Sequence, residues 1–224
     1  MPEDVKSPGF VRVLGTDPST SNMGVFVVDV NIVEPAPFKL LYANTIYGDK
    51  CIYDIPEQFD DTAGTSVAAR SFGLSRAMDT LIKVWEPDVG ICEDNFLGMS
   101  ALTFKQLIQF VGLLRETFNN NGIHLSYVLP NLAKGTVGAN FRGTQKEDVH
   151  KGLMAYRNLD AGDIDLSLLD EHSVDAGAIT LYRCEQIAKH YGVTQQWPLS
   201  ILSEEEQKKH ATLEILDRLS PPRK

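Results

Sequence analysis

Three acidic residues and one histidine stand at positions where they could together form a metal site. Asp17 follows the short apolar run VRVLG at its junction with a turn, and Glu93 ends a second short run, DVGICE. His172 and Asp175 are three residues apart, so on a helix they share one face. Carboxylate and imidazole groups are hard or borderline ligands that suit Mg²⁺ or Mn²⁺. The four residue types therefore predict metal-assisted catalysis, provided that the fold brings them together.

Some of these assignments have alternatives. An aspartate in a turn after a strand more often stabilises the turn than binds a ligand, and this interpretation applies to Asp17 taken alone. Glu171 lies four residues before Asp175, which is also a same-face spacing, so it competes with His172 as the fourth ligand. At the level of spacing both alternatives stay open.

The two neighbours of Glu93 are expected to have other roles. On a strand, Asp94 would point to the face opposite to that of Glu93. Cys92 has no histidine near it in the sequence, and we expect it in the core.

The hydrophobic pattern predicts the elements that must position these residues. Five short apolar runs predict strands, at 11–15, 24–30, 39–46, 88–93 and 123–129. The first three form an antiparallel meander, and helical segments separate the later ones. The combination predicts an α/β fold, with a mixed five-stranded sheet and helices on both faces. If the first and fourth strands are parallel neighbours, Asp17 and Glu93 emerge at the same edge of the sheet.

Four helices are predicted in the main part of the chain. They run from about Thr65 to Pro87, from Ser100 or Thr103 to the NNNG sequence, from Thr144 to about Leu159, and from Asp170 or Ser173 to Gly192. The third begins with Thr144-Gln-Lys-Glu147, which fits a capping box. We expect one domain over residues 1–195, followed by an extension, 196–224, that contains a short helix.

Net charge alone does not decide whether nucleic acid is a partner. The chain carries a charge of −9, whereas proteins that bind phosphates usually present a basic surface. Residues 131–157, however, hold five basic and two acidic residues. A metal nuclease also needs several carboxylates at its centre, and these make the sum more negative.

Cysteine usage and hydropathy predict the compartment. Three cysteines form no CxxC pair, which favours a reducing compartment and argues against a zinc site. The sequence has no apolar run of about 18 residues, and its first ten residues lack the apolar run of a secretory signal. We therefore expect a cytoplasmic protein with no membrane partner.

Two segments of the first half resemble the motifs of the RuvC-type junction resolvases, a family of the ribonuclease H-like superfamily. VLGTDPSTSNMGVFVVDV resembles the opening strand, turn and hairpin of the family, G-x-D-P-G-x-x-x-x-G, with Ser19 in place of the usual Gly. WEPDVGICEDNF resembles the second acidic strand of the family, in which a phenylalanine, here Phe96, stands three residues after the glutamate, here Glu93.

Two further segments continue the resemblance in the same order along the chain. AKGTVGANFRGTQKEDV resembles the family segment K-x-T-V-x-G with a second lysine after it, and these lysines are Lys134 and Lys146 here. EHSVDAGAITL resembles D-A-A-D-A-L-A, with His172 at the first acidic position and Asp175 at the second. Some members of the family carry histidine at that first position.

The resemblance implies an endonuclease of DNA recombination and repair that resolves four-way (Holliday) junctions by paired symmetric nicks. It implies a two-metal-ion mechanism with Mg²⁺, for which Mn²⁺ can substitute. Asp17 would bridge the ions, and Glu93, His172 and Asp175 would complete their shells. The nicks would carry 5′-phosphate and 3′-hydroxyl ends. Two symmetric cuts also imply a homodimer, for which the apolar helix face near 104–118 is the candidate interface.

The resemblance also implies contacts with branched DNA. Lys134 and Lys146 would contact phosphates, together with Arg142 from the same basic segment. Phe96 would act as a wedge against bases at the crossover, or it would close the core beneath a loop; the two interpretations are equally open. No nucleotide cofactor is expected.

Three other functions fit the sequence less well. An actin-like ATPase needs two related lobes and a second phosphate loop, which this chain lacks. A YqgF-type nuclease acting on RNA is shorter and lacks the phenylalanine loop and the second lysine. A branched-DNA-binding module without catalysis would not keep the acidic set, because carboxylates near phosphate weaken binding. The segments 47–64, 160–170 and the tail after 192 have no counterpart in the family, which suits a bacteriophage member as well as a cellular one.

Overall fold

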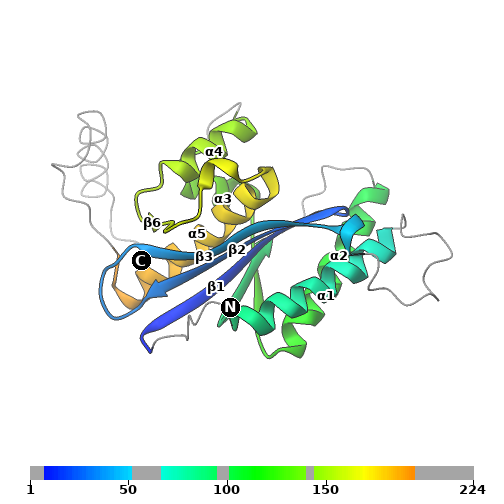
Figure 1. Ribbon diagram of the computed structural model, residues 1–224, viewed down its shortest axis with the longest axis horizontal. Helices are drawn as coiled ribbons and strands as arrows, with labels where there is room; N and C mark the ends of the chain where they lie inside the picture. The colour runs from blue at the N-terminus through cyan, green and yellow to red at the C-terminus, as the bar shows by residue number, and fades with distance from the viewer. Residues whose placement is uncertain (1–7, 52–66, 95–100, 140–143, 195–224) are drawn as a thin grey trace, which may run out of the picture. The chain divides into compact units, whose positions relative to one another are not determined.

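The computed structural model describes residues 8–51, 67–94, 101–139 and 144–194, and the structural statements below refer to these residues (Figure 1). The strands are β1 (Phe10–Pro18), β2 (Asn22–Asn31), β3 (Phe38–Tyr47), β4 (Val89–Glu93), β5 (His124–Val128) and β6 (Leu159–Asp160). The helices are α1 (Val67–Trp85), α2 (Ala101–Asn120), α3 (Pro130–Thr136), α4 (Lys146–Met154) and α5 (Glu171–Tyr191), with short 3₁₀ turns η1 (Gly48–Lys50) and η4 (Leu166–Leu168).

The strands form one mixed sheet in the order β5-β4-β1-β2-β3-β6. β1, β2 and β3 pair antiparallel as a meander, whereas β4 pairs parallel with both β1 and β5. The predicted fold, an antiparallel meander joined to parallel strands, is therefore confirmed. A sixth strand, β6, adds two residues to the far edge through parallel pairing with β3, and so short a strand carries no pattern of its own.

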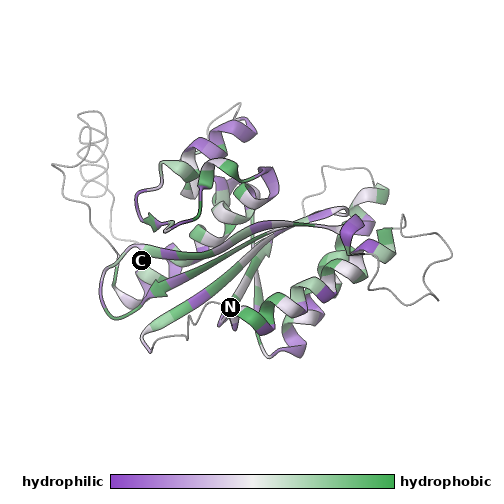
Figure 2. Ribbon diagram, viewed as in Figure 1, coloured by the Kyte–Doolittle hydropathy of each residue, from purple (hydrophilic) through white to green (hydrophobic). Residues whose placement is uncertain are grey.

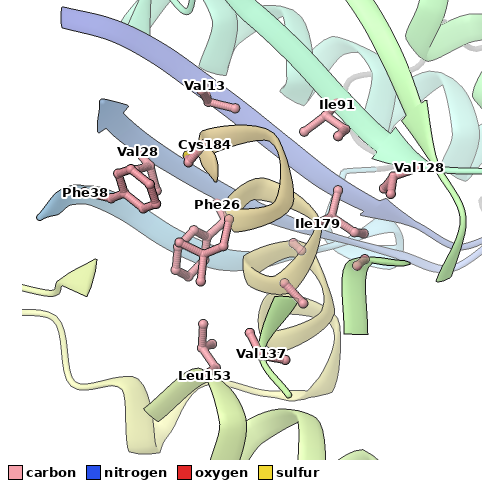
Figure 3. Close-up of a cluster of buried hydrophobic side chains, with 14 of the residues drawn as sticks. Val13, Phe26, Val28, Phe38, Ile91, Val128, Val137, Leu153, Ile179 and Cys184 are labelled. Atoms are coloured by element: carbon pink, nitrogen blue, oxygen red, sulfur yellow. The ribbon is translucent and has the colours of Figure 1, made fainter. Parts of the chain in front are cut away.

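Two helix layers cover the two faces of the sheet (Figure 1). On one face, α5 packs on Val13, Phe26 and Val28 of β1 and β2, and Figure 3 shows these side chains around Ile179 and Cys184 of the helix. On the other face, α1 and α2 pack on alternate residues of the same strands, among them Leu14, Met23, Val25 and Val27. Because both faces are covered, the central strands are buried almost continuously.

Most of the predicted helices are present. Hydrophobic and hydrophilic residues alternate along α1 and α2, as expected for helices with one buried face (Figure 2). The predicted end of the third helix at Leu159 is wrong: α4 ends at Met154, and Leu159 belongs to β6. Its capping box is shifted by one residue, because the backbone N–H of Gln145 donates to Asp148 Oδ2.

One short helix was missed by the sequence pattern. α3 begins at Pro130, which takes the first helical position that proline favours, and it covers only seven residues. Two turns are too few for a helical period to stand out.

A buried ion pair fixes the far end of β1. Arg12 Nε lies 2.7 Å from Asp29 Oδ1 on β2, and Arg12 Nη1 donates to the carbonyl oxygen of Trp85 at the end of α1. A buried charge is tolerated only when it is paired in this way. The contacts tie β1 to β2 and to the helix that leads into β4.

Cys92 and Cys184 are buried, and the three cysteines, Cys51 included, are free thiols. The core position expected for Cys92 is confirmed. No helix in the described part of the chain is long and apolar enough to cross a membrane. The predicted extension 196–224 lies outside the described residues and stays a prediction.

Candidate active site

Asp17 and Glu93 stand side by side at the ends of adjacent parallel strands. β1 and β4 pair in register up to Thr16 and Cys92, so the next residue on each strand is one of the two acids. The side chain of Asp17 is buried and that of Glu93 is half-buried. The expected parallel pairing of these strands is present, and it brings the two carboxylates to one edge of the sheet.

The first two turns of α5 bring His172 and Asp175 to the same edge. The helix approaches the strands closely because glycines lie beneath it. A Cβ atom on Gly24 would lie 1.9 Å from the carbonyl oxygen of His172, and one on Gly15 would lie 1.9 Å from Thr180 Oγ1. Any larger residue at these two positions would push the helix, and His172 with it, away from β1 and β2.

A polar cluster at the N-terminus of α5 anchors this helix to the end of β3. Asp170 caps the helix by accepting a hydrogen bond from the backbone N–H of Ser173 at 3.0 Å. Its carboxylate also accepts from Thr45 Oγ1 and, at 2.9 Å, from the hydroxyl of Tyr47. These hydrogen bonds fix the rotation and height of the first helical turn, which carries the candidate ligands.

His172 and Asp17 are in direct contact. Nδ1 of the imidazole lies 3.0 Å from Asp17 Oδ2. This hydrogen bond raises the pKa of His172, and the charge of Asp17 adds to the effect, while burial opposes it. The contact joins α5 to the end of β1 across 155 residues of sequence.

Glu93 and Asp175 belong to the same electrostatic centre as Asp17. Burial, together with the negative charges of Asp17 and Asp175, raises the pKa of Glu93 to about 7. Burial and the charge of Asp17 likewise raise the pKa of Asp175 to about 6. The charge of Asp17 thus makes ionisation of both Glu93 and Asp175 harder, and the charge of Asp175 does the same to Glu93, as expected of acidic groups that lie close together.

Two lysines border the acidic centre. Lys134, in the last turn of α3, lowers the pKa of both Glu93 and Asp175 through its charge. Lys146, the first residue of α4, also lowers the pKa of Asp175. The two predicted phosphate contacts are therefore close enough to the carboxylates for their charges to act on them.

The rival ligand Glu171 is turned toward α4. Its Oε2 lies 2.5 Å from Lys146 Nζ in an exposed ion pair, which lowers the pKa of Glu171. His172, not Glu171, makes the contact with Asp17. The geometry therefore favours His172 as the fourth member of the centre.

Asp94 is exposed beyond the end of β4, where its backbone N–H donates to the carbonyl oxygen of Val128. Its charge raises the pKa of Cys92 and of Tyr127. Cys92 packs against α1 and α2, on the face opposite to α5. The position of Asp94 agrees with the opposite-face orientation that strand alternation predicts.

Two predicted site residues, Phe96 and Arg142, lie outside the described residues, so their roles stay predictions. Conversely, Asp170, Thr45 and Tyr47 were not singled out as site residues. Asp170 carried a capping signal, but nothing local links it to a threonine 125 residues away.

The donor set of the acidic centre suits a divalent cation. Within the described parts of the chain, no group of three or more His, Cys, Asp or Glu side chains is arranged closely enough to hold a metal ion. The pKa values of Glu93 and Asp175 are nevertheless raised, first by burial and then by neighbouring carboxylates, so a cation bound here would favour their ionised forms. Oxygen donors with one imidazole are ligands that Mg²⁺ and Mn²⁺ accept.

The sequence matches no model of a known protein family and no curated protein. Solved structures, by contrast, resemble this chain closely in fold. A structure of Thermus thermophilus RuvC matches 83% of this chain and 99% of its own, at 17% identity and a TM-score of 0.56. The chain has the RuvC fold. A second structure, T. thermophilus RuvC in complex with a Holliday junction substrate, matches with a TM-score of 0.57 at 16% identity.

The yeast mitochondrial Holliday junction resolvase Ydc2 shares the RuvC fold as well. It matches 84% of this chain and 84% of its own, at 14% identity and a TM-score of 0.56. These similarities confirm the predicted ribonuclease H-like architecture, in which β1, β4 and α5 carry the four candidate residues.

Proposed function

We propose that the chain is a metal-dependent endodeoxyribonuclease that resolves four-way (Holliday) DNA junctions. The observation that carries the proposal is the convergence of Asp17, Glu93 and Asp175, with His172, at one edge of a RuvC fold. Buried carboxylates that raise one another's pKa are costly to keep, and such arrangements concentrate at functional sites. The shared fold with RuvC and Ydc2 supports a junction as the substrate.

Asp17, Glu93, His172 and Asp175 would together hold the divalent cations. When bound, such ions would stabilise the attacking and leaving oxygens of an in-line displacement at phosphorus. Before the ions bind, the hydrogen bond between His172 Nδ1 and Asp17 Oδ2 occupies one possible ligand atom of each side chain. Binding would replace that hydrogen bond, and it requires the imidazole to be neutral.

The remaining residues have two roles: two lysines bind the DNA, and other residues hold the metal ligands in place. Lys134 and Lys146 carry the positive charge that draws phosphates toward an otherwise acidic edge. Asp170 and the glycines beneath α5 keep the ligands in place, so little reorganisation is needed when substrate binds. Burial of Asp17 limits the water around it.

Paired nicks on opposite strands would require a two-fold dimer. The helix face predicted as the interface is buried in its second half and exposed in its first half. Val111 and Phe118 of α2 are buried against the sheet, whereas Ile108 is 46% exposed and Leu102, in the first turn, is 66% exposed. The proposed interface is therefore confined to the first half of α2.

The decisive experiment uses a synthetic four-way junction and a linear duplex of matched sequence, each with and without Mg²⁺. We expect symmetric nicks with 5′-phosphate ends in the junction with Mg²⁺ only, and little cutting of the duplex. Cleavage of structured RNA but not of the junction would instead support a YqgF-like activity. Tight junction binding without cleavage under any divalent cation would indicate a non-catalytic binding module.

A further inference from the structure

The ion pair of Lys146 and Glu171 lies at the rim of the acidic centre. Each is the first residue of its helix, α4 or α5, and their side chains are 67% and 48% exposed. Both line a small hollow of about 200 Å³ whose wall includes Asp175; its other lining residues are Glu147, His150 and Val174. The pair thus stands between solvent and one of the proposed ligands.

This ion pair is not required to build either helix. The first turn of α4 is closed by Asp148, which accepts from the backbone N–H of Gln145. The first turn of α5 is capped by Asp170. An exposed ion pair adds little to folding stability, because water screens it and ordering two long side chains costs entropy. Its position beside Asp175 therefore points to a role in the site.

Lys146 would have a different partner if Glu171 were neutral. Its charge already lowers the pKa of Asp175, and the charges of Asp175 and Asp17 raise the pKa of Lys146. A lysine ammonium is a compact charge on a flexible stem, so it can move to the nearest carboxylate. Bound to Asp175, it would compete directly with a divalent cation.

We propose that Glu171 is a positioning residue for Lys146. It draws the ammonium group to the rim of the hollow and so leaves Asp175 free to bind a cation. An ammonium group has three donors, and the pair with Glu171 uses one, which leaves two for the oxygens of a DNA phosphate beside the one that is cut. The cation part of this inference concerns the acidic centre itself, and the phosphate part rests on the proposed function.

Mn²⁺ binding to the whole protein without DNA tests the cation part. Glu171→Gln keeps the size of the side chain and removes its charge, and Glu147→Gln removes one charge from the same hollow without touching the pair. We expect Glu171→Gln to weaken Mn²⁺ binding by roughly two- to fivefold relative to Glu147→Gln, the scale of one exposed charge contact. Lys146→Met should keep the affinity of the parent protein or improve on it.

The double variant Glu171→Gln/Lys146→Met separates positioning from ligation. If Glu171 acts through Lys146, the double variant binds Mn²⁺ as well as Lys146→Met alone. A loss that persists in the double variant would mean that Glu171 binds the cation itself, and it would overturn the proposal. Equal Mn²⁺ affinity of Glu171→Gln and Glu147→Gln would overturn it as well.

Single-turnover cleavage of a four-way junction at saturating Mn²⁺ tests the phosphate part. Glu171→Gln should cut more slowly than Glu147→Gln, because Lys146 would no longer be positioned for the phosphate. The junction affinity of Glu171→Gln should not be reduced, since each variant loses one negative charge that repels DNA. Equal cleavage rates for the two variants would remove the phosphate role of the pair. If the parent protein cuts no junction, the proposed function fails, and the Mn²⁺ measurements still decide whether Glu171 positions Lys146.

Discussion

Nδ1 of His172 lies 3.0 Å from Oδ2 of Asp17, and this contact joins the first turn of α5 to the end of β1. The two side chains are only 21% and 12% exposed. The hydrogen bond raises the pKa of His172, so the ring keeps its proton to a higher pH than a free histidine does. When it is protonated, His172 supplies positive charge to the acidic centre and lowers the pKa of Asp175. A bound metal would take over that role.

Asp17→Asn should lower the rate of junction cleavage by roughly a hundredfold or more and leave junction binding largely intact. The amide keeps the shape of the side chain but removes the charge that a bridging ligand needs. Glu93→Gln and Asp175→Asn should behave in the same way. Single-turnover cleavage with Mg²⁺ and gel-shift binding in EDTA measure the two properties separately. Cleavage by Asp17→Asn at the rate of the parent protein would falsify the assigned centre.

The metal-free protein should lose stability as pH rises from about 4.5 to about 7. Burial and neighbouring charges raise the pKa of Glu93 from its ordinary value to about 7, so the folded state holds a proton that the unfolded state has released. The stabilisation is complete below the unfolded pKa and is lost as pH rises through the folded one. For Glu93 alone, the rise of the pKa from 4.5 to about 7 corresponds to about 3 kcal/mol.

Glu93→Gln should remove the part of this pH dependence that Glu93 contributes, whereas the part from Asp175, whose pKa is raised to about 6, should remain. At pH 8 in EDTA the variant should be more stable than the parent protein, whereas at pH 4.5 the two should be nearly equal. Added Mg²⁺ should then stabilise the parent protein more than the variant, because a cation binds the native carboxylates. Denaturant unfolding at the two pH values, with and without Mg²⁺, measures these differences, and Asp163→Asn, which changes an exposed carboxylate, is the control. Parallel pH curves for all the proteins would contradict the raised pKa.

The positions of Asp17 and Glu93 could be predicted from the sequence because each ends a short apolar run, and such runs report buried strands. The parallel pairing of β1 with β4 that brings them together was a condition of the prediction, and the structure shows it. The spacing on one helix face allowed either His172 or Glu171 beside Asp175, and the family resemblance favoured His172.

Contacts between distant segments could not be predicted in the same way. Thr45 and Asp170 are 125 residues apart, and no local pattern signals their hydrogen bond. The capping box was misplaced because Thr144…Glu147 and Gln145…Asp148 satisfy the same spacing, and only the backbone decides between them. The ion pair of Lys146 with a residue on another helix likewise depends on tertiary packing.

Lys134→Met should weaken binding to all four-way junctions alike, whatever their sequence. A lysine that contacts phosphate releases one counterion, so its loss should lower the slope of log affinity against log salt by about 0.9. Lys83→Met is a matched control. Lys83 pairs with Asp79 near the end of α1, which leads into the start of β4, whereas the acidic centre lies at the end of β4. Binding titrations at several salt concentrations give both slopes. Equal slopes for Lys134→Met and the parent protein would show that Lys134 does not contact phosphate.

Activity should fall on acidification, because His172 can bind a metal only as neutral imidazole and protons compete for it. The raised pKa of His172 moves this competition to higher pH than for a free histidine. A fall alone is not diagnostic, since a metal-bound water also loses its hydroxide form at low pH. The informative comparison is His172→Asp, whose carboxylate stays ionised well below pH 6.

If His172 is a ligand, His172→Asp should remain active with Mg²⁺ and shift its acid limb to lower pH. His172→Ala should lose most of its activity and regain part of it with Mn²⁺, because Mg²⁺ demands near-ideal octahedral coordination and so tolerates the loss of a ligand poorly. The competing assignment predicts the reverse: Glu171→Gln would be the crippling change and His172→Ala nearly silent. The contact of His172 with Asp17, and of Glu171 with Lys146, favours the first pattern. Measured pH–rate profiles of these variants beside the parent protein therefore decide which side chain holds the metal.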